Sequence, residues 1–236
     1  TFDAMDRLVR KHYVPAAGID ALADAVYTYD TASVAFSTGR LVRVDDASGS
    51  LTFSYDFMNR TVGETRTIDG NTFTDQNTYD LLGRPVRYTY PNGHQVDYAY
   101  NSAGGIETVT LKAGAVTHPI VTDITYNAAG MVTRIAYGNG TVSDYAYNPQ
   151  TLKLSHKRTL APDGSTNLQD LDYVRDPVGN ILQITDAVNT GTQLFQYDDL
   201  NRLIRAEGSS YGVQNFAYDA IGNMTTKAGM TMTYGA

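Results

Sequence analysis

Acidic residues recur along the chain at intervals of 21 to 28 residues, each preceded by an aromatic residue or its substitute. A repeated carboxylate is a candidate for general acid–base chemistry. Three copies, however, hold asparagine, which cannot exchange a proton in that way. We therefore expect the Asp or Asn side chain to accept a hydrogen bond from a backbone N–H two residues on and so to begin a turn. The ten pairs are Phe2-Asp3, Tyr29-Asp30, Tyr55-Asp56, Tyr79-Asp80, Tyr100-Asn101, Tyr126-Asn127, Tyr147-Asn148, Arg175-Asp176, Tyr197-Asp198 and Tyr218-Asp219.

A basic residue follows many of these pairs, usually after a glycine or asparagine, as in Gly83-Arg84. A repeated guanidinium could bind an anionic ligand. Because Asp3 and Arg7 share their spacing with Asp56 and Arg60, we instead expect each arginine to pair with a turn carboxylate, an exposed contact that contributes ~0–1 kcal/mol. The repeated arginines are Arg7, Arg40, Arg60, Arg84 and Arg202.

Other chemistry-bearing residues lack the spacing that a site requires. None of the four histidines (His12, His94, His118, His156) has the neighbours of a metal site. The acidic pairs Asp45-Asp46 and Asp198-Asp199 lie in no loop of regularly spaced acids. No phosphate-binding glycine loop or nucleophile motif occurs. We predict no catalytic residues, no metal and no cofactor.

Strands must position the repeated pairs, because aromatic-x-aromatic places both rings on one face of a strand. Tyr98 and Tyr100 share a face in this way, as do Tyr145 and Tyr147. The glycine or asparagine after the acid tolerates positive φ and closes the turn. Asn-Gly turns at 92–93 and 139–140 predict hairpins between the pairs. Each repeat therefore predicts two antiparallel strands and two turns. The one helical candidate, residues 19–25, is too short to stand alone.

The pattern aromatic-x-Tyr-Asp-x-x-Gly-Arg-Leu resembles the RHS/YD repeat of bacterial Rhs toxins, the cocoon-forming component of insecticidal Tc toxin complexes, wall-associated proteins and teneurins. The resemblance covers essentially all 236 residues. It implies an all-β fold of tandem antiparallel hairpins in a coiled or spiralling sheet, part of a shell that often encloses a C-terminal toxin. Three copies depart from the pattern: an insertion separates Asp30 from Gly39-Arg40, Arg175 replaces the tyrosine, and Asn148 lacks a following Gly-Arg. The family's self-cleavage signature is not recognisable, and Asp176-Pro177-Val178-Gly179 is a partial echo of it.

Composition narrows the function classes. The chain has 236 residues, 42% of them hydrophobic, which is enough for a sizeable core. Eighteen tyrosines against seven Phe and no Trp fit the repeat, and we expect their rings to pack as a core along one face rather than to stack on sugars. The net charge of −7 argues against nonspecific nucleic-acid binding. No apolar run approaches the ~20 residues of a membrane helix. Without Cys, no disulfide framework is available.

The sequence thus predicts one array of about nine to ten repeats over residues 1–236, a segment of a larger polypeptide. Its expected role is a non-enzymatic scaffold in a β-shell that encloses or displays a toxin or effector. The alternative is an adhesion module that binds glycans or a receptor through exposed tyrosines. The expected partners are flanking repeats and a C-terminal effector. We also expect edge-to-edge self-association, because the terminal segments lack the Pro or Lys residues that protect edge strands. The resemblance implies a secreted or cell-surface location.

Overall fold

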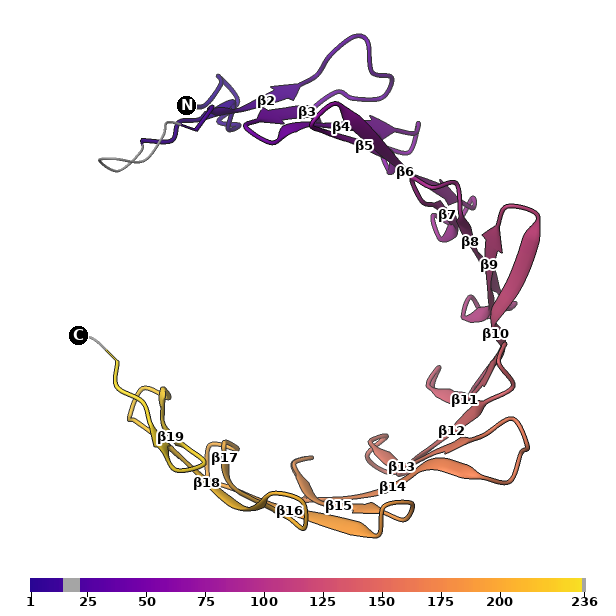
Figure 1. Ribbon diagram of the computed structural model, residues 1–236, viewed down its shortest axis with the longest axis vertical. Helices are drawn as coiled ribbons and strands as arrows, with labels where there is room; N and C mark the ends of the chain where they lie inside the picture. Colours follow the sequence, from indigo (N-terminus) through magenta and orange to yellow (C-terminus); the bar gives the residue numbers. More distant parts are fainter. Residues whose placement is uncertain (15–21, 235–236) are drawn as a thin grey trace. The chain divides into compact units, whose positions relative to one another are not determined.

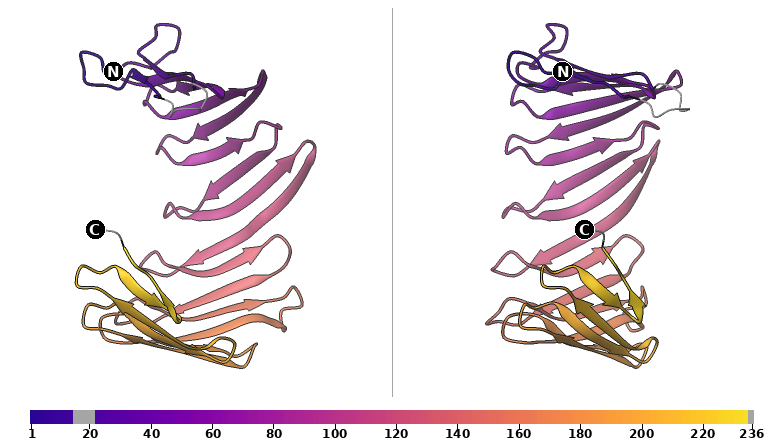
Figure 2. Two further views of the ribbon diagram at one scale, coloured as in Figure 1. Left: turned by 60° about the vertical axis from the view of Figure 1, so that its left-hand side comes forward. Right: turned by 90° about the vertical axis from the view of Figure 1, so that its left-hand side faces the viewer.

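The computed structural model describes residues 1–14 and 22–234, and every regular element within them is a β-strand. The chain divides into two compact units, residues 1–100 with 109–118 and residues 101–108 with 119–236. In each unit the strands lie side by side in a single layer, in the order of the sequence (Figure 1). The turns gather at the two ends of the strands in both units (Figure 2).

The first unit is a ladder in which each strand pairs antiparallel with the next along the chain. Two long strands, β9 (Ile106–Ala113) and β10 (Val116–Tyr126), contribute residues to both units. The remaining strands of this unit are β1 (Arg10–Lys11), β2 (Ala25–Tyr29), β3 (Leu41–Asp46), β4 (Gly49–Tyr55), β5 (Thr61–Ile68), β6 (Asn71–Tyr79), β7 (Pro85–Thr89) and β8 (Gln95–Tyr100).

The second unit repeats the arrangement from β10 onward, again with antiparallel pairing of consecutive strands. Its strands after β10 are β11 (Val132–Tyr137), β12 (Val142–Tyr147), β13 (Leu154–Leu160), β14 (Asn167–Arg175), β15 (Ile181–Asp186), β16 (Gly191–Tyr197), β17 (Leu203–Gly208), β18 (Gly212–Tyr218), β19 (Met224–Lys227) and β20 (Met230–Thr231). The predicted all-β class of tandem antiparallel hairpins is confirmed.

Both predicted Asn-Gly hairpins are present, as β7–β8 and β11–β12. Only the glycine of each turn has positive φ, +80° at Gly93 and +85° at Gly140. Each is therefore a type I turn closed by a left-handed residue rather than the two-residue type I′ turn that Asn-Gly favours. Asp69-Gly70, with φ of 49° and 78°, has positive φ at both residues.

A bulge recurs where a strand ends at a repeated tyrosine. Ser54 pairs with Gly63 but Tyr55 pairs with Thr61, so Val62 has no partner opposite. Such an extra residue bends the strand and increases its twist. Seven other strands carry the same irregularity, at Thr28/Tyr29, Thr78/Tyr79, Thr125/Tyr126, Ala146/Tyr147, Val174/Arg175, Gln196/Tyr197 and Ala217/Tyr218.

The expected tyrosine core is absent from the described part of the chain. Its buried hydrophobic residues are only Ala25, Val42 and Ala206, and no large side chain is fully buried. The physical reason is the single layer, because a side chain on one sheet face touches only its neighbours on that face. Tyr100 and Tyr147 are half-buried. The expectation of a sizeable core, made from chain length and composition, was wrong.

Residues 19–21 of the helical candidate at 19–25 lie outside the described residues. Residues 22–24 have no regular structure, and Ala25 begins strand β2. Within residues 1–14 and 22–234, nothing forms a helix of the length and hydrophobicity that crossing a membrane requires.

Candidate functional site

The repeated residues meet at a turn that we call the YD corner: the tyrosine, the Asp or Asn after it, and the residues up to the arginine position. In the corner at 55–60, the Asp56 Oδ1 atom accepts hydrogen bonds from the backbone N–H groups of Met58 and Arg60, each at 2.9 Å. The Asn59 N–H donates to the Asp56 carbonyl at 2.9 Å, and Asn59 has a φ of 64°. The side chain thus closes a turn that ends in a left-handed residue.

Asparagine performs the same role where it replaces aspartate. Asn127 Oδ1 accepts from the N–H groups of Ala129 and Met131, each at 3.0 Å. Asn101 accepts from Ala103 at 3.0 Å and Gly105 at 2.9 Å. The hydrogen bond two residues on, which the sequence predicted, is present in both forms. The structure also shows a second bond, from the N–H four residues on, which the sequence did not predict.

Arginine pairs with its own turn carboxylate, as the spacing predicted, in four corners. For Arg40 the prediction was wrong, because the Asp30 carboxylate pairs with Arg7 instead. The Arg60 Nε atom donates to Asp56 Oδ2 at 2.7 Å, and the same contact recurs in Arg7–Asp3, Arg84–Asp80 and Arg202–Asp198. These side chains are partly exposed, so solvent screens the ion pairs and each contributes little by itself.

The tyrosine hydroxyl links neighbouring repeats. Tyr79 donates to the Thr61 carbonyl at 2.9 Å, and Thr61 is the residue directly after the arginine position of the preceding corner. This bond extends the contact between β5 and β6 beyond the backbone ladder, which ends at the pair Gly63–Gln76. The same bond joins Tyr29 to Leu8, Tyr55 to Leu41, Tyr100 to Pro85, Tyr126 to Ile106, Tyr147 to Val132, Tyr218 to Leu203 and Tyr234 to Met224.

The arginine also lies against the tyrosine of the next corner. Arg60 Cζ is 4.6 Å from the centre of the Tyr79 ring, and its NH1 atom donates to the Asp80 carbonyl at 3.1 Å. A guanidinium at this distance is attracted by the ring face, by ~0.5–1 kcal/mol at exposed sites. The other pairs are Arg7 on Tyr29, Arg40 on Tyr55, Arg84 on Tyr100 and Arg202 on Tyr218.

The electrostatics of the corner keep its carboxylates ionised. The pKa of Asp80 lies below its ordinary value, first because the carboxylate accepts the Arg84 backbone N–H and also because it bonds the Arg84 guanidinium. Asp198 has a lowered pKa for the same reasons, with Arg202 as partner. A carboxylate with a lowered pKa is a poor general base near neutral pH. Burial raises the pKa of the Tyr55 hydroxyl, which therefore stays a hydrogen-bond donor.

The remaining predicted site residues lie in corners or on the strands that lead into them. Tyr98 is in β8 and Tyr145 in β12, and both are half-buried. The Lys157 ammonium lies 5.9 Å from the centre of the Tyr145 ring. Tyr197 ends β16 opposite Leu203. Gly83 takes a φ of 82° in the left-handed position of its corner.

The departures from the repeat pattern keep the turn. Across the insertion, Asp30 still accepts from the Gly39 N–H. Asn148 accepts from Gln150 at 2.9 Å and Thr151 at 3.0 Å. Asp176 accepts from Val178, Gly179 and Asn180, and Asp219 accepts from Ile221 and Asn223.

Two histidines contact carboxylates, which the sequence did not predict. His12 Nδ1 is 2.7 Å from Asp24, and His156 contacts Asp172 at 2.8 Å and Asp170 at 3.3 Å. These partners lie on a neighbouring strand or segment, so only the register brings them together. In the described part of the chain, no cluster of three potential metal ligands occurs.

Corners, bulges and register together define a tandem array of antiparallel β-hairpins. No protein-family model and no curated protein matches the sequence. Among solved structures, the chain is similar to TcdB2-TccC3-Cdc42, with a TM-score of 0.72 and 21% identity over 88% of this chain and 14% of that one. It is also similar to TcdB2-TccC3-TEV, with a TM-score of 0.72 and 20% identity over 96% of this chain and 15% of that one.

A third match is the Photorhabdus luminescens Tc holotoxin pore, with a TM-score of 0.69 and 22% identity over 88% of this chain and 14% of that one. These matches confirm, at the level of the fold, the resemblance to the RHS/YD family. The chain spans about one seventh of the length of the solved chains that it matches.

Proposed function

We propose that residues 1–236 form a single array of repeats that acts as a non-enzymatic scaffold, part of a β-shell that encloses a toxin or effector segment. The observation that carries this proposal is the hydroxyl-to-carbonyl bond, because through it the repeated tyrosine joins one repeat to the repeat before it. The likeness in fold to the Tc toxin structures supports it.

The repeated acid supports the same proposal. Asp and Asn make equivalent hydrogen bonds in the corners, so the position requires an acceptor and not a proton donor. The glycan-binding alternative is not favoured, because the corner hydroxyls that would face a sugar already donate to carbonyls of the sheet.

The partners of such a scaffold are the flanking repeats and the enclosed effector, and its location is outside the producing cell. Flanking repeats would pair with the terminal strands. Of the described strands, β20 is two residues long, and its backbone groups are the natural template for a further strand. Arg10 of β1 already exchanges backbone hydrogen bonds with Thr1, so at this end a further strand would pair with the segment that holds Thr1.

Protease protection in the natural polypeptide tests enclosure. The effector segment should resist cleavage while the array is folded, and it should become sensitive at the denaturant concentration that unfolds the array. The control is the same effector expressed alone, which should be cut without denaturant. Cleavage of the effector at one rate with and without the array would contradict enclosure.

A further inference from the structure

The corner at 147–153 differs from the others in its charges. Asn148 replaces the aspartate and uses its oxygen for the N–H groups of Gln150 and Thr151. Lys153 stands where other corners have arginine, with no carboxylate beside it. In contrast to Arg60 on Asp56, the Lys153 ammonium forms no ion pair with any residue in the described part of the chain. The corner therefore carries an uncompensated positive charge.

A second cation lies where this corner meets the next. Arg175 replaces the tyrosine, and its Nε atom donates to the Leu154 carbonyl at 3.4 Å, the position that a tyrosine hydroxyl reaches elsewhere. Its NH1 atom donates to the Gly179 carbonyl at 2.9 Å. A guanidinium has five N–H donors, so donors remain for a further acceptor.

The carboxylate that lines the same pocket forms no ion pair with these cations. Asp176 Oδ1 accepts three backbone N–H groups of its own turn, and Oδ2 accepts the Asn180 amide at 2.9 Å. Arg175, like Lys153, forms no ion pair with a described residue. Two cations thus stand together in a chain whose net charge is −7.

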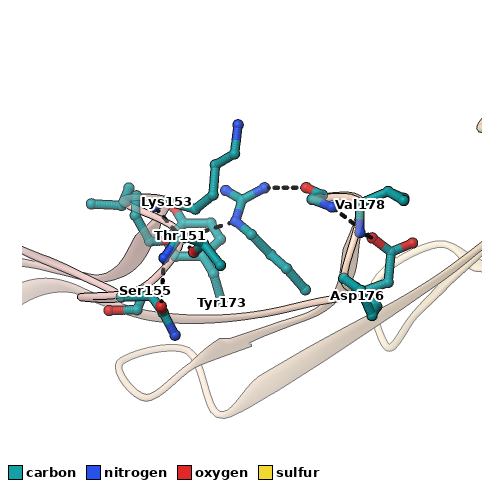
Figure 3. A pocket seen from close by; sticks show the side chains of 11 residues that line it. Thr151, Lys153, Ser155, Tyr173, Asp176 and Val178 are labelled. Atoms are coloured by element: carbon teal, nitrogen blue, oxygen red, sulfur yellow. Dashed lines mark hydrogen bonds between the residues drawn. The ribbon is translucent and has the colours of Figure 1, made fainter.

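A pocket of about 150 Å³ lies between the two cations and their turns. Thr151, Lys153, Ser155 and Tyr173 lie on one side of it, and Asp176 and Val178 on the other (Figure 3). The Lys153 ammonium is 3.9 Å from the position that a Cβ atom would take on Gly179, the residue whose carbonyl accepts from Arg175. Both cations therefore border the same space.

We propose that this pocket binds a carboxylate group through Lys153 and Arg175. The planar guanidinium matches the geometry of a carboxylate, and the ammonium supplies a second charge. Leu154, Tyr173 and Pro177 add apolar wall for a short carbon chain. The volume suits one small group and is below the ~300 Å³ of drug-sized sites. The carboxylate can come from a free organic acid or from an acidic side chain of a peptide.

Titration of the ¹⁵N-labelled full chain by NMR tests the site. Sodium butyrate is one probe, and a short blocked peptide with a single Glu is the other, both at constant ionic strength set with NaCl. We expect saturable shifts confined to residues 151–155 and 175–180, with a Kd on the order of millimolar because the site is open to solvent. A peptide that binds tenfold more tightly than butyrate identifies a protein segment as the source, and equal affinities identify a free acid.

Two variants and a control make the test decisive. Arg175→Tyr restores the residue of the other corners and with it the hydroxyl-to-carbonyl bond, so the fold is retained while affinity falls at least tenfold. Lys153→Gln should have a similar effect. Lys157→Gln is the control: it removes a cation from β13, the strand that begins directly after Lys153, at a position that does not line the pocket, and it should leave binding unchanged. Shifts that grow linearly with concentration, that chloride reproduces, or that survive both variants would overturn the proposal.

Discussion

The residue at the centre of each YD corner is a hydrogen-bond acceptor whose charge is secondary. Its Oδ1 atom bonds two N–H groups of the turn, and an amide oxygen does this as well as a carboxylate. Only the Oδ2 contact with arginine requires aspartate. The two functions can therefore be separated by substitution at one position.

Asp56→Asn should lower the free energy of unfolding much less than Asp56→Ala. Asparagine keeps both turn hydrogen bonds and loses only the partly exposed ion pair, whereas alanine leaves the Met58 and Arg60 N–H groups without their acceptor. Urea denaturation of the two variants measures the difference. If the asparagine variant were the less stable, the acceptor interpretation would be wrong.

Asp97 makes the stability of the first unit depend on pH in the acidic range. Its hydrogen bonds with Arg87 and then Lys112 lower its pKa to about 2. Because this value is below the unfolded value of 3.8, the contribution is complete above about pH 4 and is lost as the pH falls toward 2. The urea midpoint should therefore decrease over this interval, and Asp97→Asn should reduce that decrease. An identical pH profile in wild type and variant would exclude Asp97 as a cause.

The sequence predicted part of the corner and missed its hydrogen bond to the neighbouring repeat. The acceptor at Asp56 and the partner of Arg60 follow from spacing within one turn. The bond from Tyr79 to Thr61 joins residues 18 positions apart, so it depends on the register of two strands, which spacing within a repeat does not fix. The pocket at Arg175 was missed for the same reason, although the substitution itself was visible in the sequence.

At the scale of the element, each repeat is two strands, a YD corner and an opposite turn. Alternating aromatics and turn residues predicted these two strands and two turns. The bulge was not predictable, because the unpaired Val62 is a residue that fits any strand. The absence of a large core was missed as well, since composition counts apolar residues and cannot tell whether a second layer covers them.

Substitutions at the left-handed position of the corner test whether its backbone conformation contributes to stability. Gly83 has a φ of 82°, and asparagine holds the same position at Asn59 and Asn201 with φ of 64° and 59°. Gly83→Val should destabilise by about 1–2 kcal/mol, because a β-branched residue is strained there. Gly83→Asn is the matched control and should cost clearly less. Equal losses in urea denaturation would show that the backbone conformation does not matter.

In the molecule as a whole, contacts between neighbouring repeats supply the stability. The described residues contain no large buried side chain, so no single region can supply the stability. In repeat proteins, stability is approximately a sum of unit and nearest-neighbour terms. The tyrosine hydroxyl is one such term, and it recurs in both units.

The repeated tyrosines hold neighbouring repeats together through their hydroxyl groups, and a Tyr-to-Phe series measures this contribution. The variants are Tyr55→Phe, Tyr79→Phe, Tyr126→Phe, Tyr147→Phe and Tyr218→Phe, with Tyr98→Phe as the control whose hydroxyl joins no repeat. Native-state hydrogen exchange should show each corner variant losing about 0.5–1.5 kcal/mol in its own and the preceding repeat. The control should lose nothing. Corner variants that exchange like the control would contradict the claim.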